Sequence, residues 1–139
     1  MSNHTAAPTF PAEEINIPAV VAELTPLCDA YEQALMANDL DTLDQLFWAS
    51  PSTLRYGVSE NLYGIEEIRA FRVGRSGGSP QRDVLRRVIT TYGHDFATCN
   101  LEFVRPATGT RGRQSQTWLR TANGWRIAAA HVSLMNTDR

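Results

Sequence analysis

The chain has 139 residues, 42% of them hydrophobic, so it is long enough for one globular domain with a real core but short for a cofactor domain plus a substrate domain. Its formal charge of −2 provides no electrostatic footprint for nucleic acid or for an anionic membrane surface. All thirteen basic residues are Arg, which excludes a lysine nucleophile or Schiff base and leaves guanidinium groups to hold any anionic substrate.

Cysteine and histidine usage argues against disulfides and metals. Cys28 and Cys99 have no paired spacing, and no apolar targeting segment opens the chain. We therefore expect neither a disulfide scaffold nor export, and we place the protein in the cytoplasm. The histidines His4, His94 and His131 are scattered, so the sequence predicts no metal site.

The N-terminal part of the chain is expected to be a leader followed by a long helix. Residues 1–14 mix Pro, Ala, Ser and Thr without periodicity and are predicted to be disordered, with a single domain over 15–139. Apolar residues then recur at helical spacing over 17–37, and Asn16 is the expected cap. Pro26 lies inside this helix, where it either kinks the helix or makes its first turns a separate piece.

Short elements follow the long helix. Asp39 is expected to cap a second helix that ends at Leu46. A short strand over 53–57 and a turn-rich link over 60–64 lead to a third helix over 65–72. The Ser-Gly-Gly-Ser-Pro run at 76–80 is expected to be a flexible loop.

The second half of the chain predicts a run of strands separated by turn signals. These strands are expected at 83–92, 96–105, 113–121 and 125–135. Helices first and an antiparallel meander afterwards indicate an α+β domain, in which a curved antiparallel sheet wraps around the long N-terminal helix beside two shorter helices.

The last two strands carry amides, hydroxyls and one histidine where a plain sheet would carry aliphatic residues. Side chains two apart share one face of a strand, so Gln114, Gln116 and Trp118 lie on one face. On the next strand, strict alternation places on one face Trp125, Ile127, Ala129, His131 and Ser133. A polar face beneath helices predicts a pocket. The alternating set, Arg126, Ala128, Ala130 and Val132, is then expected on the outer face, where it predicts a homodimer.

Several longer strings resemble a known family. The final GW-R-I-x-x-x-H-x-S is similar to the SnoaL-like cone of the nuclear transport factor superfamily, which has a cystatin-like fold with one pocket. The strings YEQAL, LFW, RYG, ENLYGIEEIRAFR, ITTYGHDFAT and GRQSQTW through AAHVSLM resemble the AtzH-like family over about 17–135. Within it, the strings look most like the members associated with oxalurate catabolism. The resemblance implies a decarboxylating amidohydrolase acting on a small carboxylated ureide.

Two residues are the catalytic candidates. Arg55 follows Leu54 in a short strand, where an Arg is ordinarily a surface residue or the partner of a carboxylate. The resemblance implies instead that it lines the pocket and binds a substrate carboxylate. Tyr31 lies on the helix face expected to cover the sheet, where the pattern alone predicts a core aromatic. The resemblance implies that it transfers a proton at the reacting centre.

The other candidates are substrate-binding residues, each with a structural alternative. Arg72 lies on a helix face that is solvated by default but can supply a second carboxylate fork. Asn61 and Tyr63 lie on a link that turn formation alone explains or that forms the pocket rim. A buried hydrogen-bond network and ligand contact are equally good interpretations of Gln114, Gln116 and His131.

Two functions from different classes remain open at this point. One is an amidohydrolase that needs no metal and no cofactor and acts on a carboxylated ureide. The other is a non-catalytic protein that binds a small dicarboxylate or docks on an amidase of the same pathway, because an Arg that binds carboxylate serves both roles. In either case we expect no nucleic acid and no membrane as a partner.

Overall fold

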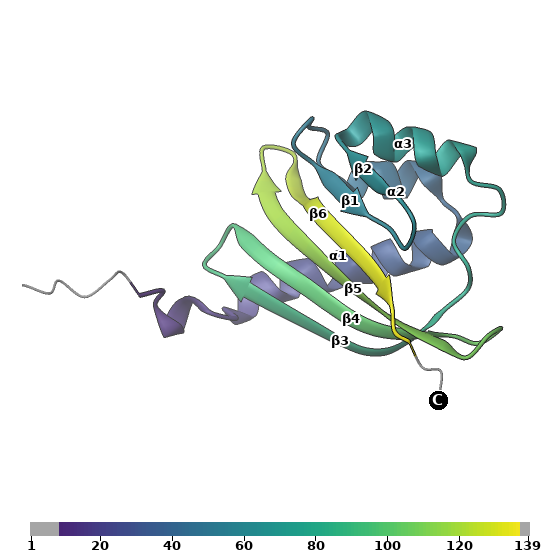
Figure 1. Ribbon diagram of the computed structural model, residues 1–139. Helices are drawn as coiled ribbons and strands as arrows, with labels where there is room; N and C mark the ends of the chain where they lie inside the picture. The colour runs from purple at the N-terminus through teal and green to yellow at the C-terminus, as the bar shows by residue number, and fades with distance from the viewer. Residues whose placement is uncertain (1–8, 137–139) are drawn as a thin grey trace, which may run out of the picture.

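Three helices lie on one face of a curved six-stranded sheet in the computed structural model, which describes residues 9–136 (Figure 1). The helices are α1 (Pro18–Ala37), α2 (Leu40–Leu46) and α3 (Ile65–Gly74). The strands are β1 (Leu54–Tyr56), β2 (Asn61–Tyr63), β3 (Asp83–Tyr92), β4 (Phe96–Arg105), β5 (Thr110–Thr121) and β6 (Gly124–Leu134). The predicted α+β architecture is therefore confirmed.

The described chain begins with structure that the sequence analysis did not predict. A 3₁₀ helix spans Ala12–Glu14, within the expected leader, and Ile15 then pairs with Tyr92 at the end of β3. The ring of Phe10 meets Tyr92 edge-on, with 6.1 Å between the ring centroids. Residues 1–8, the rest of the expected leader, lie outside the described residues.

The long helix α1 differs from prediction at its start. Asn16 does not cap it: this residue has a left-handed backbone (φ 59°), and its side-chain oxygen accepts a hydrogen bond from the Thr91 N–H at 2.9 Å. The N-cap is Ile17, and Pro18 opens the first turn, where its missing N–H costs nothing. The helix is continuous through Pro26 up to Asn38, whose left-handed conformation ends it, so the first turns are not a separate piece.

The middle of the chain is more regular than predicted. Asp39 caps α2 as expected, accepting from the Thr42 N–H at 3.2 Å. The link after the first short strand, however, contains a second strand, because β2 pairs antiparallel with β1 around a tight hairpin. Helix α3 also runs two residues beyond the predicted end, to Gly74.

The strand order is β2-β1-β6-β5-β4-β3, and one pair is parallel. Strands β3 to β6 form the predicted antiparallel meander, but β1 joins β6 in parallel orientation, which makes the sheet mixed. This parallel pairing carries the β1–β2 hairpin to the far side of β6. Arg55, opposite Ala130, is thereby brought to the inner face of the sheet.

A β-bulge in β6 overturns the predicted register of the last strand. Thr117 pairs with Ala129 while the next residue, Trp118, pairs with Ile127, so Ala128 is an extra residue without a partner in β5. Beyond the bulge every side chain changes face. The prediction that Ala130 and Val132 lie outside was therefore wrong: both are buried on the inner face.

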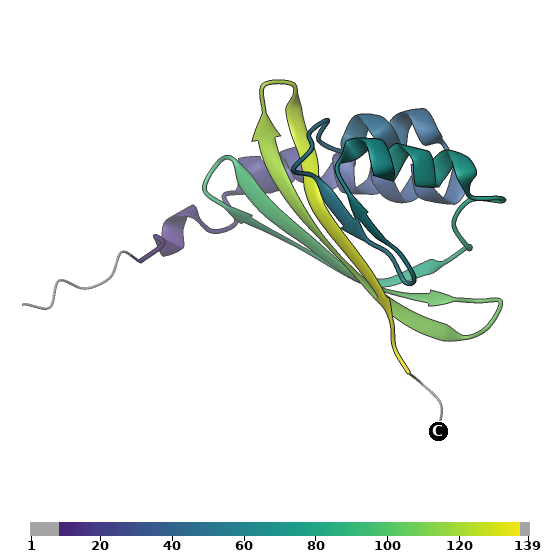
Figure 2. The same ribbon diagram turned by 45° about the horizontal axis from the view of Figure 1, so that its top comes forward.

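The inner face of the sheet packs against α1 to make the core. Helix α1 buries one stripe of side chains against it, among them Val20, Leu24 and Tyr31, and Trp118 and Ile127 meet this stripe from β5 and β6. Both views show all three helices on this side of the sheet (Figures 1 and 2). The main apolar cluster ends before the far end of the sheet, where the inner face carries buried polar side chains together with a small second cluster of Leu101, Phe103 and Val132.

Candidate functional site

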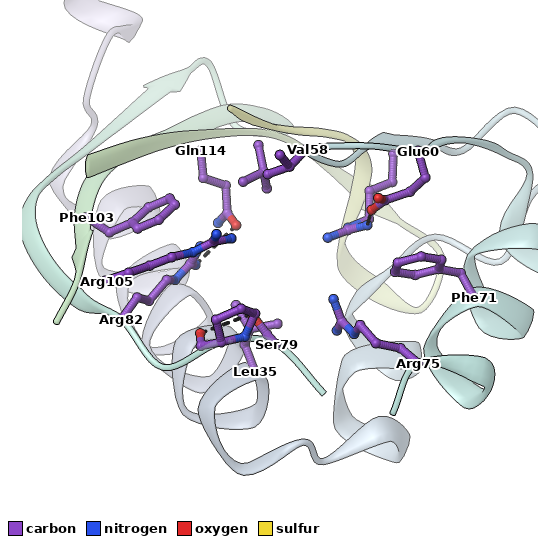
Figure 3. Close-up of a pocket in the computed structure, with 13 residues that line it drawn as sticks. Leu35, Val58, Glu60, Phe71, Arg75, Ser79, Arg82, Phe103, Arg105 and Gln114 are labelled. Carbon is purple, nitrogen blue, oxygen red and sulfur yellow. Dashed lines mark hydrogen bonds and ion pairs between the residues drawn. The ribbon is translucent and has the colours of Figure 1, made fainter. Parts of the chain in front are cut away.

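A small cavity of about 160 Å³ lies on the inner face of the sheet, between the β1–β2 hairpin, the end of α3 and the segment that leads into β3 (Figure 3). A cavity of this volume has room for ordered water or for a ligand of few atoms. Its lining consists of Leu35, Arg55, Val58, Glu60, Phe71, Arg75, Ser79, Pro80, Arg82, Phe103, Arg105, Gln114 and Val132. Four of these residues are arginines, so cationic groups dominate the cavity.

Arg55 reaches the cavity from β1, as the sequence analysis expected. The residue is buried, with 7% of its surface exposed, and its Nη1 donates to Glu60 Oε2 at 2.9 Å. Glu60 Oε1 in turn accepts from the Ser59 N–H at 3.3 Å, so this carboxylate is held by its own hairpin turn. Only one nitrogen of the Arg55 guanidinium donates to Glu60. The other N–H groups of this guanidinium make no hydrogen bond to Glu60.

Arg82 is the most firmly fixed guanidinium of the site. Its Nε and Nη2 donate to the two carboxylate oxygens of Glu32 on α1, at 2.8 and 2.7 Å, which is the bidentate geometry that an Arg and a carboxylate prefer. Nη2 also donates to the Gln114 side-chain oxygen at 3.1 Å, and the guanidinium lies over the Phe103 ring at 4.6 Å. These contacts orient the Gln114 amide in the cavity wall.

Arg75 and Arg105 line the cavity without an acidic partner among residues 9–136. The guanidinium of Arg75 lies 5.2 Å from the centre of the Phe71 ring, and Arg55 lies 5.7 Å from the same centre. The Nε of Arg75 is buried and has no hydrogen-bond partner in the described part of the chain. Burial lowers the pKa of Arg75, and the nearby charges of Arg55 and Arg72 lower it further.

Tyr31 and Arg72 adjoin this cluster but are not part of the cavity lining. Tyr31 is buried on α1, with its ring 6.2 Å from that of Phe47. Arg72 donates to Asp44 Oδ1 at 3.1 Å and stacks on Phe47 at 4.5 Å. Burial lowers the pKa of both Arg72 and Arg75, and the charge of a deprotonated Tyr31 would oppose this on both.

The remaining candidates are divided between the two faces of the sheet. Gln114 lines the cavity, whereas Gln116, also buried, accepts from the Trp118 indole N–H at 3.1 Å in the core. His131 is exposed on the outer face, contrary to prediction, because the bulge at Ala128 reverses the alternation. There its ring meets Tyr56 edge-on at 5.5 Å.

The two predicted rim residues also lie away from the cavity. Asn61 and Tyr63 are exposed on β2, and the Tyr63 hydroxyl lies 3.3 Å from that of Tyr56. In this strand it is Leu62, paired with Arg55, that faces inward and packs against the core. The rim expectation failed because the segment is a strand, and alternation turns its polar residues outward.

Sequence reasoning missed several residues of the cavity, and only one of them had a clear signal. Arg105 ends the series Leu101, Phe103, Arg105 on the inner face of β4, so strand alternation alone would have predicted an inward cation. Arg75 and Arg82 flank the Ser-Gly-Gly-Ser-Pro loop, where no periodicity indicates direction. They enter the site through the tertiary fold alone.

Two further observations concern the described residues as a whole. No helix among them is long and apolar enough to cross a membrane. Within residues 9–136 no three His, Cys, Asp or Glu side chains come together as metal ligands, and Cys28 and Cys99 are buried free thiols.

Solved structures with the same architecture cover nearly the whole chain. A protein of unknown function from Pectobacterium atrosepticum, described as a member of the DUF3225 family, is 49% identical, with 92% of this chain and 100% of that one covered and a TM-score of 0.89. A cystatin-like fold protein from Burkholderia xenovorans is 45% identical over 90% and 98% of the two chains, with a TM-score of 0.84.

A more distant structure supports the superfamily. A nuclear transport factor 2-like protein from Salmonella enterica is 26% identical, with 86% of this chain and 94% of that one covered and a TM-score of 0.71. The chain has no match among the curated proteins. The family model described as AtzH-like matches residues 13–138, which is almost the entire chain. The chain therefore belongs to the AtzH-like family and has the cystatin-like fold of the nuclear transport factor 2-like proteins.

Proposed function

We propose that this protein is a decarboxylating amidohydrolase that acts, without a cofactor, on a small carboxylated ureide of the kind met in oxalurate or carboxyurea catabolism. The observation that carries the proposal is the cavity of about 160 Å³ with four guanidinium groups in its wall. Guanidinium forks bind carboxylates bidentately, and the cavity volume suits a ligand of few atoms. The reaction class is the one that the resemblance to the AtzH-like family implies, and the chain belongs to that family.

The reaction requires groups that stabilise the negative charge of the substrate and one proton for the nitrogen that loses the carboxyl group. In a carboxylated urea the carboxyl group is bonded to nitrogen as a carbamate. The C–N bond breaks, its electron pair stays on nitrogen, the nitrogen takes a proton from the Tyr31 hydroxyl, and the carboxyl group leaves as CO₂. Water then returns a proton to Tyr31, and the hydroxide formed combines with CO₂ to give bicarbonate. Proton transfer of this kind contributes about 10²–10⁴-fold to a rate.

Each residue has a distinct role in this proposal. Arg55 binds the substrate carboxylate with the donors that Glu60 does not use, and the Gln114 amide, fixed by Arg82, hydrogen-bonds the ureide. In this proposal the reacting nitrogen lies on the side of the cavity nearest Tyr31, which is buried and outside the cavity lining. There the positive charges beside Tyr31 stabilise the phenolate that proton transfer leaves.

The experiment is a CO₂ release assay on a freshly prepared carboxylated urea, with the decarboxylated urea measured as the second product. Oxalurate, whose carboxylate is bonded to carbon, is assayed in parallel for hydrolysis of its amide C–N bond. Arg55→Lys keeps the charge but loses the fork, so we expect a higher KM and a kcat/KM reduced by about 10–100-fold, for a lost charged hydrogen bond of about 1.5–3 kcal/mol. Tyr31→Phe should act mainly on kcat, by a similar factor. Turnover of both variants at the parent rate would show that this catalytic assignment is wrong.

A second candidate function is binding without turnover, either of a small dicarboxylate or as an accessory subunit of a pathway amidase. The observation in its favour is that Tyr31 is outside the cavity lining while the arginines are inside it. The same assay separates the two. If the parent protein turns over neither the carboxylated urea nor oxalurate but binds a dicarboxylate through Arg55, the binding function holds and the enzymatic one fails.

A further inference from the structure

Of the four arginines that line the cavity, two form an ion pair with an acidic residue among those that the structure describes and two do not. Arg55 donates to Glu60 at 2.9 Å, and Arg82 is held by both oxygens of Glu32. Arg75 and Arg105 form no ion pair with any acid in the described part of the chain, although both line the same cavity. Two guanidinium groups of the cavity therefore form no direct ion pair with a carboxylate of residues 9–136, although Glu60 acts on Arg75 at longer range and favours its charge.

Arg75 is in an environment that disfavours its own charge. It stacks on Phe71, which also carries the Arg55 guanidinium, so two like charges share one ring. Its Nε is removed from water without a hydrogen bond from any described residue. A buried donor without a partner destabilises a folded protein, and the repulsion from Arg55 and Arg72, which Glu60 offsets only from a distance, adds to the cost. A purely structural arginine would have an acceptor here, as Arg82 has in Glu32.

We infer that Arg75 is a ligand-binding residue of this cavity and that, with Arg105, it selects a ligand with two anionic groups. Figure 3 shows Arg75 and Arg105 reaching toward the hollow from opposite sides, Arg75 from the end of α3 and Arg105 from the end of β4. A ligand with a carboxylate at each end would neutralise both. This inference rests on the proposed function only to the extent that the cavity binds a carboxylate, and it does not require turnover.

If Arg75 serves to bind a ligand, its removal should raise the stability of the protein without ligand. If Arg75 serves only the structure, its removal should lower that stability. Arg75→Met keeps much of the aliphatic packing but removes the unpaired charge, so the Tm of the ligand-free protein should rise by about 2–4 °C. The same substitution should weaken binding of malonate, a small ligand with two carboxylates, by about 10–100-fold. Arg69→Met is the matched control, because Arg69 lies on the same helix, 41% exposed, with only a 3.9 Å contact to Glu66.

The experiment measures malonate and malonamate binding by calorimetry at low salt, together with thermal melts of each ligand-free variant. Malonamate has one carboxylate replaced by an amide, so the preference of the parent protein for malonate reports the second anionic contact. We expect this preference in the parent and in Arg69→Met, its loss in Arg75→Met, and a partial loss in Arg75→Lys, which keeps the charge without the fork.

Every outcome bears on one of the two proposals. A lower Tm for Arg75→Met with unchanged malonate affinity would make Arg75 a structural residue and overturn the inference, while weaker binding by Arg55→Lys would still support the proposed function. Equal affinity of the parent for malonate and malonamate would overturn the selection of two anionic groups. Failure of the parent to bind any small carboxylate or ureide would overturn the inference and the proposed function together.

Discussion

Glu60 folds back over its own hairpin turn and occupies one side of the Arg55 guanidinium, the group that we expect to bind the substrate carboxylate. Gly57 makes room for it, because a Cβ at this position would overlap the Glu60 carboxyl group. The protein thus supplies a carboxylate of its own to Arg55, and a ligand carboxylate must share that guanidinium with it.

Glu60→Gln should therefore tighten malonate binding. A partly exposed ion pair of this kind is worth up to about 1 kcal/mol, so the expected gain is about three- to fivefold in Kd. Gly57→Ala should act in the same direction without changing the net charge, because the new methyl group pushes Glu60 away from Arg55. Glu66→Gln, at an exposed position of α3, is the control. Unchanged or weaker malonate binding by both variants would instead make Glu60 a residue that positions Arg55 for its ligand.

Single residues were predictable where alternation or helical spacing fixed their direction. Gln114 reaches the cavity as alternation with the buried Trp118 predicted, whereas Arg55 was placed there by the family resemblance and not by its strand neighbours. Arg72 was placed on a solvated or substrate-binding face, yet it is buried against Phe47 and Asp44. Helical spacing could not show this, because the ring and the carboxylate come from another part of the chain.

At the scale of whole strands, close approach of β4 and β5 shapes the cavity wall. Gly112 pairs with Phe103, whose ring lies where a Cβ at 112 would be. The Arg82 guanidinium lies over the same ring. A methyl group at 112 must therefore displace the ring, and with it the surface on which Arg82 stacks.

We predict that Gly112→Ala lowers the free energy of unfolding by about 1–3 kcal/mol, the usual cost of overpacking, and weakens malonate binding. Ser115→Ala, on the outer face of the same strand, should stay within about 0.5 kcal/mol of the parent. Urea unfolding of both variants tests this. A loss below about 0.5 kcal/mol for Gly112→Ala would show that Phe103 moves aside freely and does not anchor the wall.

The boundaries of β3 and β4 were predictable to the residue, whereas the faces of β6 were not. Turn signals at both ends fixed where the strands begin and end. The bulge lies within Ala128–Ala130, three identical small side chains that fit either face, so no apolar pattern marks the extra residue. Strict alternation therefore predicted His131 on the inner face and Val132 on the outer face, and the structure shows the reverse.

The uncovered face of the sheet is the main feature at the scale of the whole molecule. The three α-helices lie on the other face (Figures 1 and 2). A sheet with one open face is stable alone only if the side chains on that face are polar enough to contact water. The three α-helices, the antiparallel meander of β3 to β6 and the α+β class followed from the order of elements. The parallel pairing of β1 with β6 did not, because long-range pairing leaves no local trace.

The homodimer predicted from the sequence remains a proposal, now on different residues. With Ala130 and Val132 inside, the central outer face carries the small side chains of Ser115, Thr117 and Ala129, and Val88 is 42% exposed toward its edge. Small side chains make a flat surface on which a second copy can pack closely, and the two-fold arrangement is the commonest for such association. We expect the outer faces of two copies to meet here.

Light scattering after size-exclusion chromatography at micromolar concentration should then give twice the 15.5 kDa mass of one chain. Ala129→Arg should shift this to the monomer mass, because association would bury an unpaired charge at the centre of the interface, while the fold is kept since the residue faces away from the core. Ala70→Arg, exposed on α3, is the control for added charge and should stay dimeric. A compact monomer for the parent protein, or a dimer that survives Ala129→Arg, would show that the outer face is not the interface.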